Sequence, residues 1–194
     1  MSRNLCLAIV LMTLAACGSG TNTPPSRLDD ACSIVNERPA YLRAMKRAEK
    51  KWGTPVAVQM ATLYQESKFM SDARTPYRYS LGVIPMGRQS SAFGYAQALD
   101  GTWDDYRDDT RNYAGRRNKI DDATDFMGWY MDETFRRHGI PKTDARRHYL
   151  AYHEGHTGYG RGSYNQKQWL MRVANEVGSR AVMYDFQLKS CGKI

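Results

Sequence analysis

The chain has 194 residues, of which 42% are hydrophobic, 11% aromatic and 25% charged. This length fits one globular domain and little more, and the composition excludes a disordered or fibrous protein. The formal net charge of +8 indicates anionic partners, but charge alone does not distinguish nucleic acid, anionic lipid and cell-wall polymer.

The N-terminus has the pattern of an export signal. Arg3 precedes a nearly continuous apolar run over residues 5–15, too short for a permanent membrane-spanning helix, which needs roughly 20 residues. The run ends in Leu-Ala-Ala-Cys (residues 14–17), which resembles the bacterial lipobox. We therefore predict a signal peptide over residues 1–16 and acylation of Cys17; the alternative is a cleaved signal with a chance cysteine. No second long apolar run follows, so we expect the remainder to be soluble.

The next segment (GSGTNTPPSRLDD) is rich in Gly, Ser, Thr and Pro, which predicts a flexible tether over residues 17–31 and one domain over residues 32–194. Cys6 would leave with the signal and Cys17 would carry lipid, so Cys32 and Cys191 remain at the two ends of the domain. In an oxidising compartment we expect them to form a disulfide, the alternative being two unpaired thiols.

The domain is predicted to be mainly α. Thr54 and Pro55 suit the N-cap and first residue of a helix that runs to about Ser67. Hydrophobic spacing predicts the other helices over residues 39–51, 101–110, 121–138, 144–153, 166–177 and 179–188. Residues 71–92 contain four prolines and glycines and are predicted to be a long loop, which would also hold any minor strand content.

The strongest chemical signal is Gln65-Glu66-Ser67 at the end of the predicted helix 54–67. Leu63 and Thr62 lie three and four residues before Glu66, so its carboxyl shares a helix face with weakly polar and apolar groups. Desolvation and the negative end of the helix dipole both raise a carboxyl pKa. A glycosidase acid needs such a pKa to hold its proton at neutral pH. The alternative is a solvated glutamate at a frayed helix end.

Two further segments accompany this glutamate: Gly94 to Gln97 (GYAQ), after the long loop, and Ala151 to Gly155 (AYHEG), at the end of a predicted helix. With Glu66-Ser67 they resemble, in order, the Glu-Ser, Gly-x-x-Gln and Ala-Tyr-Asn-x-Gly signatures of the soluble-lytic-transglycosylase (SLT) superfamily. The resemblance covers residues 40–177 and extends to small lipoproteins of that superfamily. It implies a single α+β, lysozyme-like domain similar to goose-type lysozyme, acting on peptidoglycan as a monomer without cofactor.

The resemblance also implies residue roles. Glu66 is the single acid/base, which protonates the glycosidic oxygen between N-acetylmuramic acid and N-acetylglucosamine and then deprotonates the 6-hydroxyl, giving a 1,6-anhydro sugar. Ser67 and Gln97 are polar groups of the glycan cleft, and Tyr152 contacts the sugar at the scissile bond. His153 replaces the family asparagine at a substrate contact. The Glu66–Gln97 spacing is longer than usual, so we expect loop 71–92 to line the cleft.

Hydrolysis usually requires a second carboxylate. The candidates are Asp100, Asp104 and Glu154, and the sequence places none of them near Glu66. Two rival functions therefore remain, a hydrolytic muramidase on the same fold and a non-catalytic wall-binding lipoprotein. The intact Glu66-Ser67 pair argues against the second.

Other side chains have ordinary interpretations. A group of three histidines and one glutamate matches no known zinc motif, so we predict no metal site: His148, His153, His156 and Glu154. An exported protein does not meet nucleic acid, so the many basic residues predict a solvated face, or attraction to acidic peptide stems.

The aromatic residues divide into two groups. Four are predicted in the core: Trp103, Trp129, Tyr130 and Trp169. Three near the motifs are better candidates for sugar platforms: Tyr77, Tyr79 and Tyr95. Gly18 and Ser19 lack the aspartate that usually retains lipoproteins in the inner membrane, which favours an outer-membrane anchor facing the periplasm.

Overall fold

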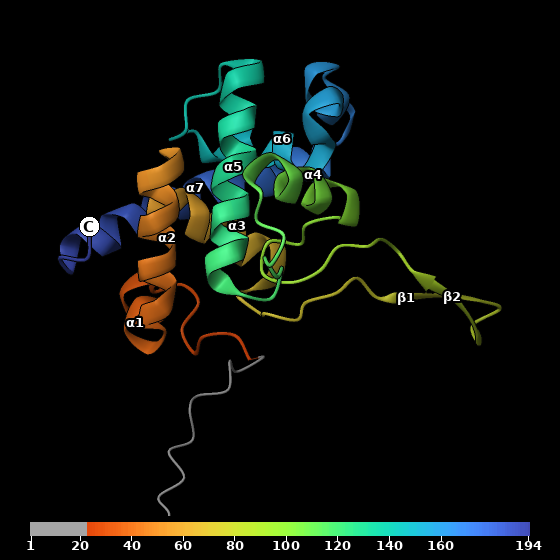
Figure 1. Cartoon of the computed structure of the whole chain (residues 1–194), viewed down its shortest axis with the longest axis horizontal. Coiled ribbons are helices and arrows are strands. Elements are labelled where there is room, and N and C mark those ends of the chain that lie inside the picture. The colour runs from red at the N-terminus through yellow and green to blue at the C-terminus, as the bar shows by residue number, and fades with distance from the viewer. Residues whose placement is uncertain (1–22) are drawn as a thin grey trace, which may run out of the picture.

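The computed structural model describes residues 23–194, so the predicted signal peptide and Cys17 lie outside the described residues. The described chain is mainly helical with one small sheet, as predicted (Figure 1). Its elements in order are α1 (Ala31–Glu37), α2 (Pro39–Trp52), α3 (Val56–Ser67), β1 (Tyr77–Ser80), β2 (Ile84–Arg88), α4 (Asp100–Thr110), α5 (Ile120–His138), α6 (Ala145–Gly160), the short 3₁₀ helix η1 (Ser163–Gln166) and α7 (Gln168–Ser190). None of these helices has the length and apolar character needed to cross a membrane.

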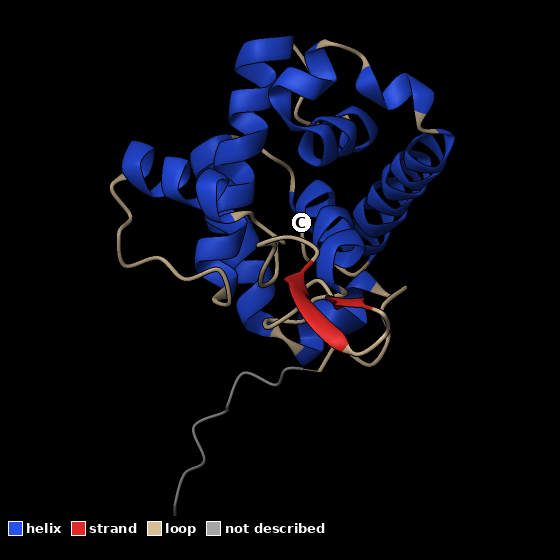
Figure 2. Cartoon of the chain, turned by 90° about the vertical axis from the view of Figure 1, so that its right-hand side faces the viewer, coloured by secondary structure: helices blue, strands red, loops and turns tan. Residues whose placement is uncertain are grey.

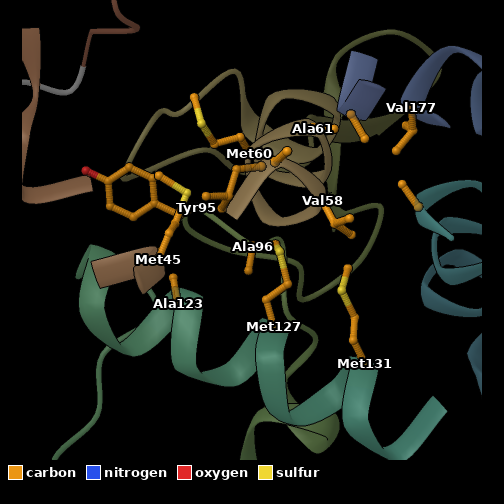
Figure 3. Close-up of a cluster of buried hydrophobic side chains, with 14 of the residues drawn as sticks. Met45, Val58, Met60, Ala61, Tyr95, Ala96, Ala123, Met127, Met131 and Val177 are labelled. Atoms are coloured by element: carbon orange, nitrogen blue, oxygen red, sulfur yellow. The ribbon is translucent and has the colours of Figure 1, made fainter. Parts of the chain in front are cut away.

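Helix α3 is the centre of the core. Every residue from Val56 to Leu63 is buried, and a helix buried on all sides belongs inside a domain. It packs against α7, α2, α6 and α5. Figure 3 shows Val58, Met60 and Ala61 of α3 in one cluster of buried side chains with Met127 and Met131 of α5. The position of each residue at the end of α3 is therefore fixed by neighbours on several sides.

Most predicted helices are confirmed, with three differences. Thr54 does not cap α3, because Pro55 occupies the N-cap position and Thr54 is buried beneath it. The two helices predicted over residues 166–177 and 179–188 form the single helix α7. Gly178 does not break it; a Cβ there would lie 3.3 Å from the Cβ of Arg146, so this glycine lets α6 and α7 approach closely. Helix α6 extends beyond His153 and contains a non-helical residue, Gly155, with φ 72° and ψ 158°.

The packed part of the chain begins inside the predicted tether. Helix α1, which the sequence did not predict, is capped by the Asp30 carboxylate, which accepts a hydrogen bond from the Ser33 amide at 2.8 Å. The Tyr184 hydroxyl of α7 donates to the Leu28 carbonyl, and Arg180 pairs with Asp29 at 2.7 Å. The last residues of the tether are thus held against α7 because they supply the caps and ion pairs of this end of the domain.

The expected disulfide is present. Cys32 of α1 and Cys191, at the end of α7, are bonded across a sequence separation of 159 residues. The bond joins α1 to the C-terminal end of the longest helix, so the two ends of the domain are one structural unit.

The loop predicted over residues 71–92 contains the only sheet of the described chain. Strands β1 and β2 pair antiparallel, with Tyr77 opposite Arg88 and Ser80 opposite Ile84. The hairpin projects from the helical body in Figure 1, and Figure 2 views it from its projecting side, with the strands in red. All nine strand residues are exposed.

Removing the disulfide should destabilise the domain. We expect a Cys32→Ser/Cys191→Ser variant to lose up to about 4–5 kcal/mol of unfolding free energy, because a cross-link over so long a loop restricts the unfolded chain. Urea unfolding measures the loss, and reduction of the wild-type protein should reproduce it. Equal stability of the oxidised and reduced proteins would contradict the prediction.

Candidate active site

Glu66 lies in the last turn of α3, and the chain turns sharply directly after it. Lys68 and Phe69 adopt left-handed backbone conformations, with φ of 52° and 62°, which side chains other than glycine seldom adopt. Phe69 is fully buried and stacks on Tyr41 at 5.8 Å between ring centroids. Burial of this ring stabilises the turn and so fixes the end of α3 that carries Glu66.

The Glu66 carboxyl is partly removed from water and has one hydroxyl partner. Burial raises its pKa from 4.5 to about 7, while a hydrogen bond from Tyr149 and the charge of Lys68 act in the opposite direction. Tyr149 belongs to α6 and is buried. A carboxyl with this pKa holds its proton in a large fraction of molecules at neutral pH, as a general acid requires.

The other candidate carboxylates are engaged elsewhere. Asp100 pairs with Arg117 at 2.7 Å, and Asp104 pairs with Arg107 at 2.8 Å. Burial raises the pKa of Glu154, but hydrogen bonds, the largest from Lys167, lower it to about 2. Among the described residues, no carboxylate contributes to the pKa shift of Glu66.

The Gly94–Gln97 turn lies beside this site and is shaped by its own residues. A Cβ on Gly94 would lie 2.2 Å from the Arg117 carbonyl oxygen, and its φ is 80°, so only glycine fits. The Gln97 side-chain amide donates to the carbonyls of Ala73 and Gly94 at 2.9 and 2.8 Å. Gln97 therefore ties the turn to the segment that follows α3.

A hollow of about 200 Å³, here called the central hollow, brings three predicted residues together: Gln97, Tyr152 and His153. The Tyr152 hydroxyl donates to the Ala96 carbonyl at 2.5 Å, so α6 is fixed to the turn. The charge of Glu66 raises the pKa of Tyr152 further above its ordinary value, after the larger effect of burial. Glu66 does not itself line the central hollow, and Tyr152 is the residue of its lining on which the charge of Glu66 acts.

The surroundings of the site differ in charge. Beyond Glu154 the central hollow adjoins a wider one of about 610 Å³, whose lining includes Asp105, Asp108, Asp109 and Glu133. A third hollow, of about 470 Å³, lies between the end of α3 and α7. In it, Lys68 and Arg180 each lie 3.5 Å from the centroid of the Tyr64 ring. The charged side chains that line the wider hollow are thus mainly carboxylates, with Arg137 among them, and those of the third hollow are mainly cations, with Glu176 among them.

These features agree with a comparison with known families. Residues 5–191 match the family model described as the transglycosylase SLT domain. The chain belongs to this family. A comparison with curated proteins found no match. The family supports lytic transglycosylase activity on peptidoglycan, and the observed helical fold with its small sheet suits an SLT domain.

Two residues that were predicted to contact the glycan, Ser67 and Tyr95, are buried instead. Ser67 is buried, and its hydroxyl donates to the Leu63 carbonyl one turn earlier at 3.2 Å, so it supports α3 instead of facing a glycan. Tyr95 is also buried, with its hydroxyl 3.2 Å from that of Tyr41, and offers no free ring face. Figure 3 shows Tyr95 among the core side chains.

The predicted aromatic core is correct except for Trp169. Trp103, Trp129 and Tyr130 are buried, whereas Trp169 is 48% exposed. Its ring lies edge-to-face with His153 at 5.1 Å between centroids, because the start of α7 packs beside α6. The imidazole of His153 also lies 3.0 Å from the Glu154 carboxylate. Tyr77 and Tyr79 are exposed, but no hairpin residue lines the central hollow, contrary to the expectation for loop 71–92.

The histidines occupy separate environments. His148 is fully buried, and His156 stacks on Tyr130 and lies 2.9 Å from the Thr134 hydroxyl. Within residues 23–194, no three side chains of the metal-binding types are grouped as a metal would require.

Tyr149 is the site residue that sequence reasoning missed. It lies three residues before Tyr152 on α6, and residues at this spacing share a helix face. The signal was therefore available, but only the tertiary structure shows that this face meets the end of α3.

Glu66→Gln should change the pH dependence of stability. A carboxyl whose pKa rises from 4.5 to about 7 on folding contributes stability below 4.5 that is lost as pH rises through 7. The amide that replaces the carboxyl cannot ionise, so the variant should gain stability relative to wild type across this range. Urea unfolding at several pH values measures the difference, with the exposed Glu176→Gln as control. A constant difference would contradict the raised pKa.

Tyr149→Phe should raise the pKa of Glu66, because the lost hydrogen bond stabilises the ionised carboxyl. We expect the alkaline limb of the pH–activity profile to move to higher pH. Tyr106→Phe is the matched control, since this buried tyrosine donates to Asp125, at 2.7 Å, instead. A Tyr149→Phe profile that stays in place or moves to lower pH would exclude the contact with Glu66.

Proposed function

We propose that this SLT domain cleaves the β-1,4 bond between N-acetylmuramic acid and N-acetylglucosamine without water, with Glu66 as its single acid/base. The observation that carries the proposal is the burial of the Glu66 carboxyl, which raises its pKa to about 7 and brings its charge close enough to act on Tyr152, a residue that lines the central hollow with Gln97. A second carboxylate is not among the groups that shift this pKa in the described chain.

In the first step, protonated Glu66 gives its proton to the glycosidic oxygen, and the bond to the anomeric carbon breaks. N-acetylglucosamine leaves with a new hydroxyl, and positive charge builds on the muramic acid ring. The ionised Glu66 carboxylate then accepts the Tyr149 hydrogen bond. This contact stabilises the charged form that the step creates.

In the second step, the carboxylate takes the proton of the 6-hydroxyl, and that oxygen bonds to the anomeric carbon. Glu66 returns to its protonated form, and the product is a 1,6-anhydro sugar. Because the nucleophile belongs to the same sugar, it acts at a high effective concentration. A positioned water and a second carboxylate are therefore unnecessary.

The residues of the central hollow have supporting roles in this proposal. Tyr152 contacts the sugar at the scissile bond and is held by the Ala96 carbonyl. Gln97 has both amide contacts on backbone carbonyls, so it maintains the turn while its remaining surface meets the glycan. His153 and the exposed Trp169 form a further contact surface at the rim. Ser67 has no direct part, because its hydroxyl serves α3.

We also propose that the enzyme is exported and anchored by acylated Cys17, in the outer membrane and facing the periplasm. The support is the lipobox-like sequence and the Cys32–Cys191 disulfide, since disulfides persist in oxidising compartments. Mass spectrometry of the purified membrane form tests the anchor through the mass added at Cys17.

Glu66→Gln should abolish most of the activity while the fold is kept. General acid–base catalysis contributes about 10²–10⁴-fold, and one group serves both steps here, so we expect a loss at the upper end. Release of 1,6-anhydro-muropeptides from purified sacculi measures it, and Glu176→Gln is the control. If folded Glu66→Gln retains a rate near wild type, the acid is another group. If the wild-type enzyme releases reducing ends, the reaction is hydrolysis.

A further inference from the structure

The turn of the β1–β2 hairpin exposes aliphatic side chains that the fold leaves uncovered. Leu81 is 88% exposed and Val83 76% exposed, and Ile84 and Met86 beside them are also more than half exposed. Within the described chain the two strands contact each other and no helix. A contiguous exposed apolar group of this kind marks an interaction surface.

Side-chain character changes in a regular order along the hairpin. The aliphatic turn is followed on β1 by Tyr79, Arg78 and Tyr77, and the base carries Arg88 and Arg74. The Arg88 guanidinium lies 4.3 Å from the Tyr77 ring centroid. Residues 74–88 include these three arginines and no acidic residue. Apolar, aromatic and basic groups follow the same order across the interface between hydrocarbon and anionic headgroups.

We propose that this hairpin docks the domain onto an anionic phospholipid surface. The edges of a two-stranded sheet carry unpaired backbone groups, which do not enter hydrocarbon. Only the side chains of Leu81, Val83 and Ile84 therefore reach the acyl boundary, while the backbone of the turn and strands stays among the headgroups and the arginines meet the phosphates. The hairpin projects beyond the helices (Figure 1), so its turn reaches a flat surface before the body does.

Two other occupants fit the observations less well. Glycans bind to aromatic faces and polar groups, whereas the turn is aliphatic. A second copy of this chain would bring the arginines of one hairpin against those of another if the hairpins paired symmetrically. Anionic lipid offers acyl chains to the aliphatic side chains of the turn and phosphate groups to the arginines. Lipid docking does not require Glu66, so this inference stands or fails independently of the proposed function.

The test uses the chain beginning at residue 18, which cannot be acylated at Cys17. This chain keeps both cysteines of the disulfide and the whole described core, residues 31–188, and thermal melting verifies its fold. It is mixed with vesicles of phosphatidylglycerol and phosphatidylcholine, or of phosphatidylcholine alone, and sedimented. We expect binding to the anionic vesicles that weakens with added salt.

Leu81→Ser/Val83→Ser should lower the partition coefficient about tenfold, because two inserting side chains lose their apolar surface. The matched control is Val182→Ser/Phe186→Ser on α7, where both side chains are 72% exposed, and it should bind as wild type. Arg78→Gln should lower binding about fivefold on anionic vesicles and have little effect on neutral ones.

Several results would overturn the proposal. They are equal binding by the turn variant and wild type, absence of vesicle binding by wild type, and equal loss in the α7 control. Hairpin-dependent sedimentation with purified sacculi but not vesicles would assign the turn to the cell wall instead. A hairpin-dependent dimer in light scattering that does not bind vesicles would assign it to a second copy.

Discussion

The burial of α3 on all sides is the constraint on which the rest of the structure depends. Because neighbouring helices cover it, the last turn cannot place Glu66 in open water. The carboxyl is left between the core and the surface, where desolvation raises its pKa to about 7. The position of one helix thus sets both the packing of the domain and the protonation state of its proposed acid.

This arrangement places unfavourable interactions at the site that the remainder of the fold offsets. Burial makes the ionised form of the Glu66 carboxyl less favourable in the folded protein than in the unfolded chain. Directly after it, Lys68 and Phe69 adopt strained left-handed backbone conformations. Burial of Phe69, the hydrogen bond from Tyr149 and the Cys32–Cys191 bond act in the other direction. Strained backbone and carboxyls with perturbed pKa values both cluster at functional sites, which supports the proposed role of Glu66.

The domain presents separate surfaces for separate tasks. The central hollow lies where α6 meets the Gly94–Gln97 turn, and the hairpin leaves the same part of the chain in another direction, joined to the turn by Gln97 and the Ala73 carbonyl. The hairpin lies between α3 and the turn in the chain and contributes no residue to the lining of the hollow.

The sequence by itself determined the helical class, most helix positions, the segment that holds the small sheet and the disulfide partners, and it indicated Glu66 as the candidate acid. Hydrophobic periodicity, turn residues and short motifs are local properties, so they can be read from the sequence. Contacts between elements were decided only by the tertiary structure. Tyr149 meets Glu66 through the packing of α6 on α3, and Tyr95 and Ser67 turn into the core because neighbouring helices cover them. Gly178 was predicted to separate two helices, but it lies inside α7 and allows α6 and α7 to approach closely. Spacing along a chain reports which side chains share a face, but which element covers that face depends on the packing of the whole domain.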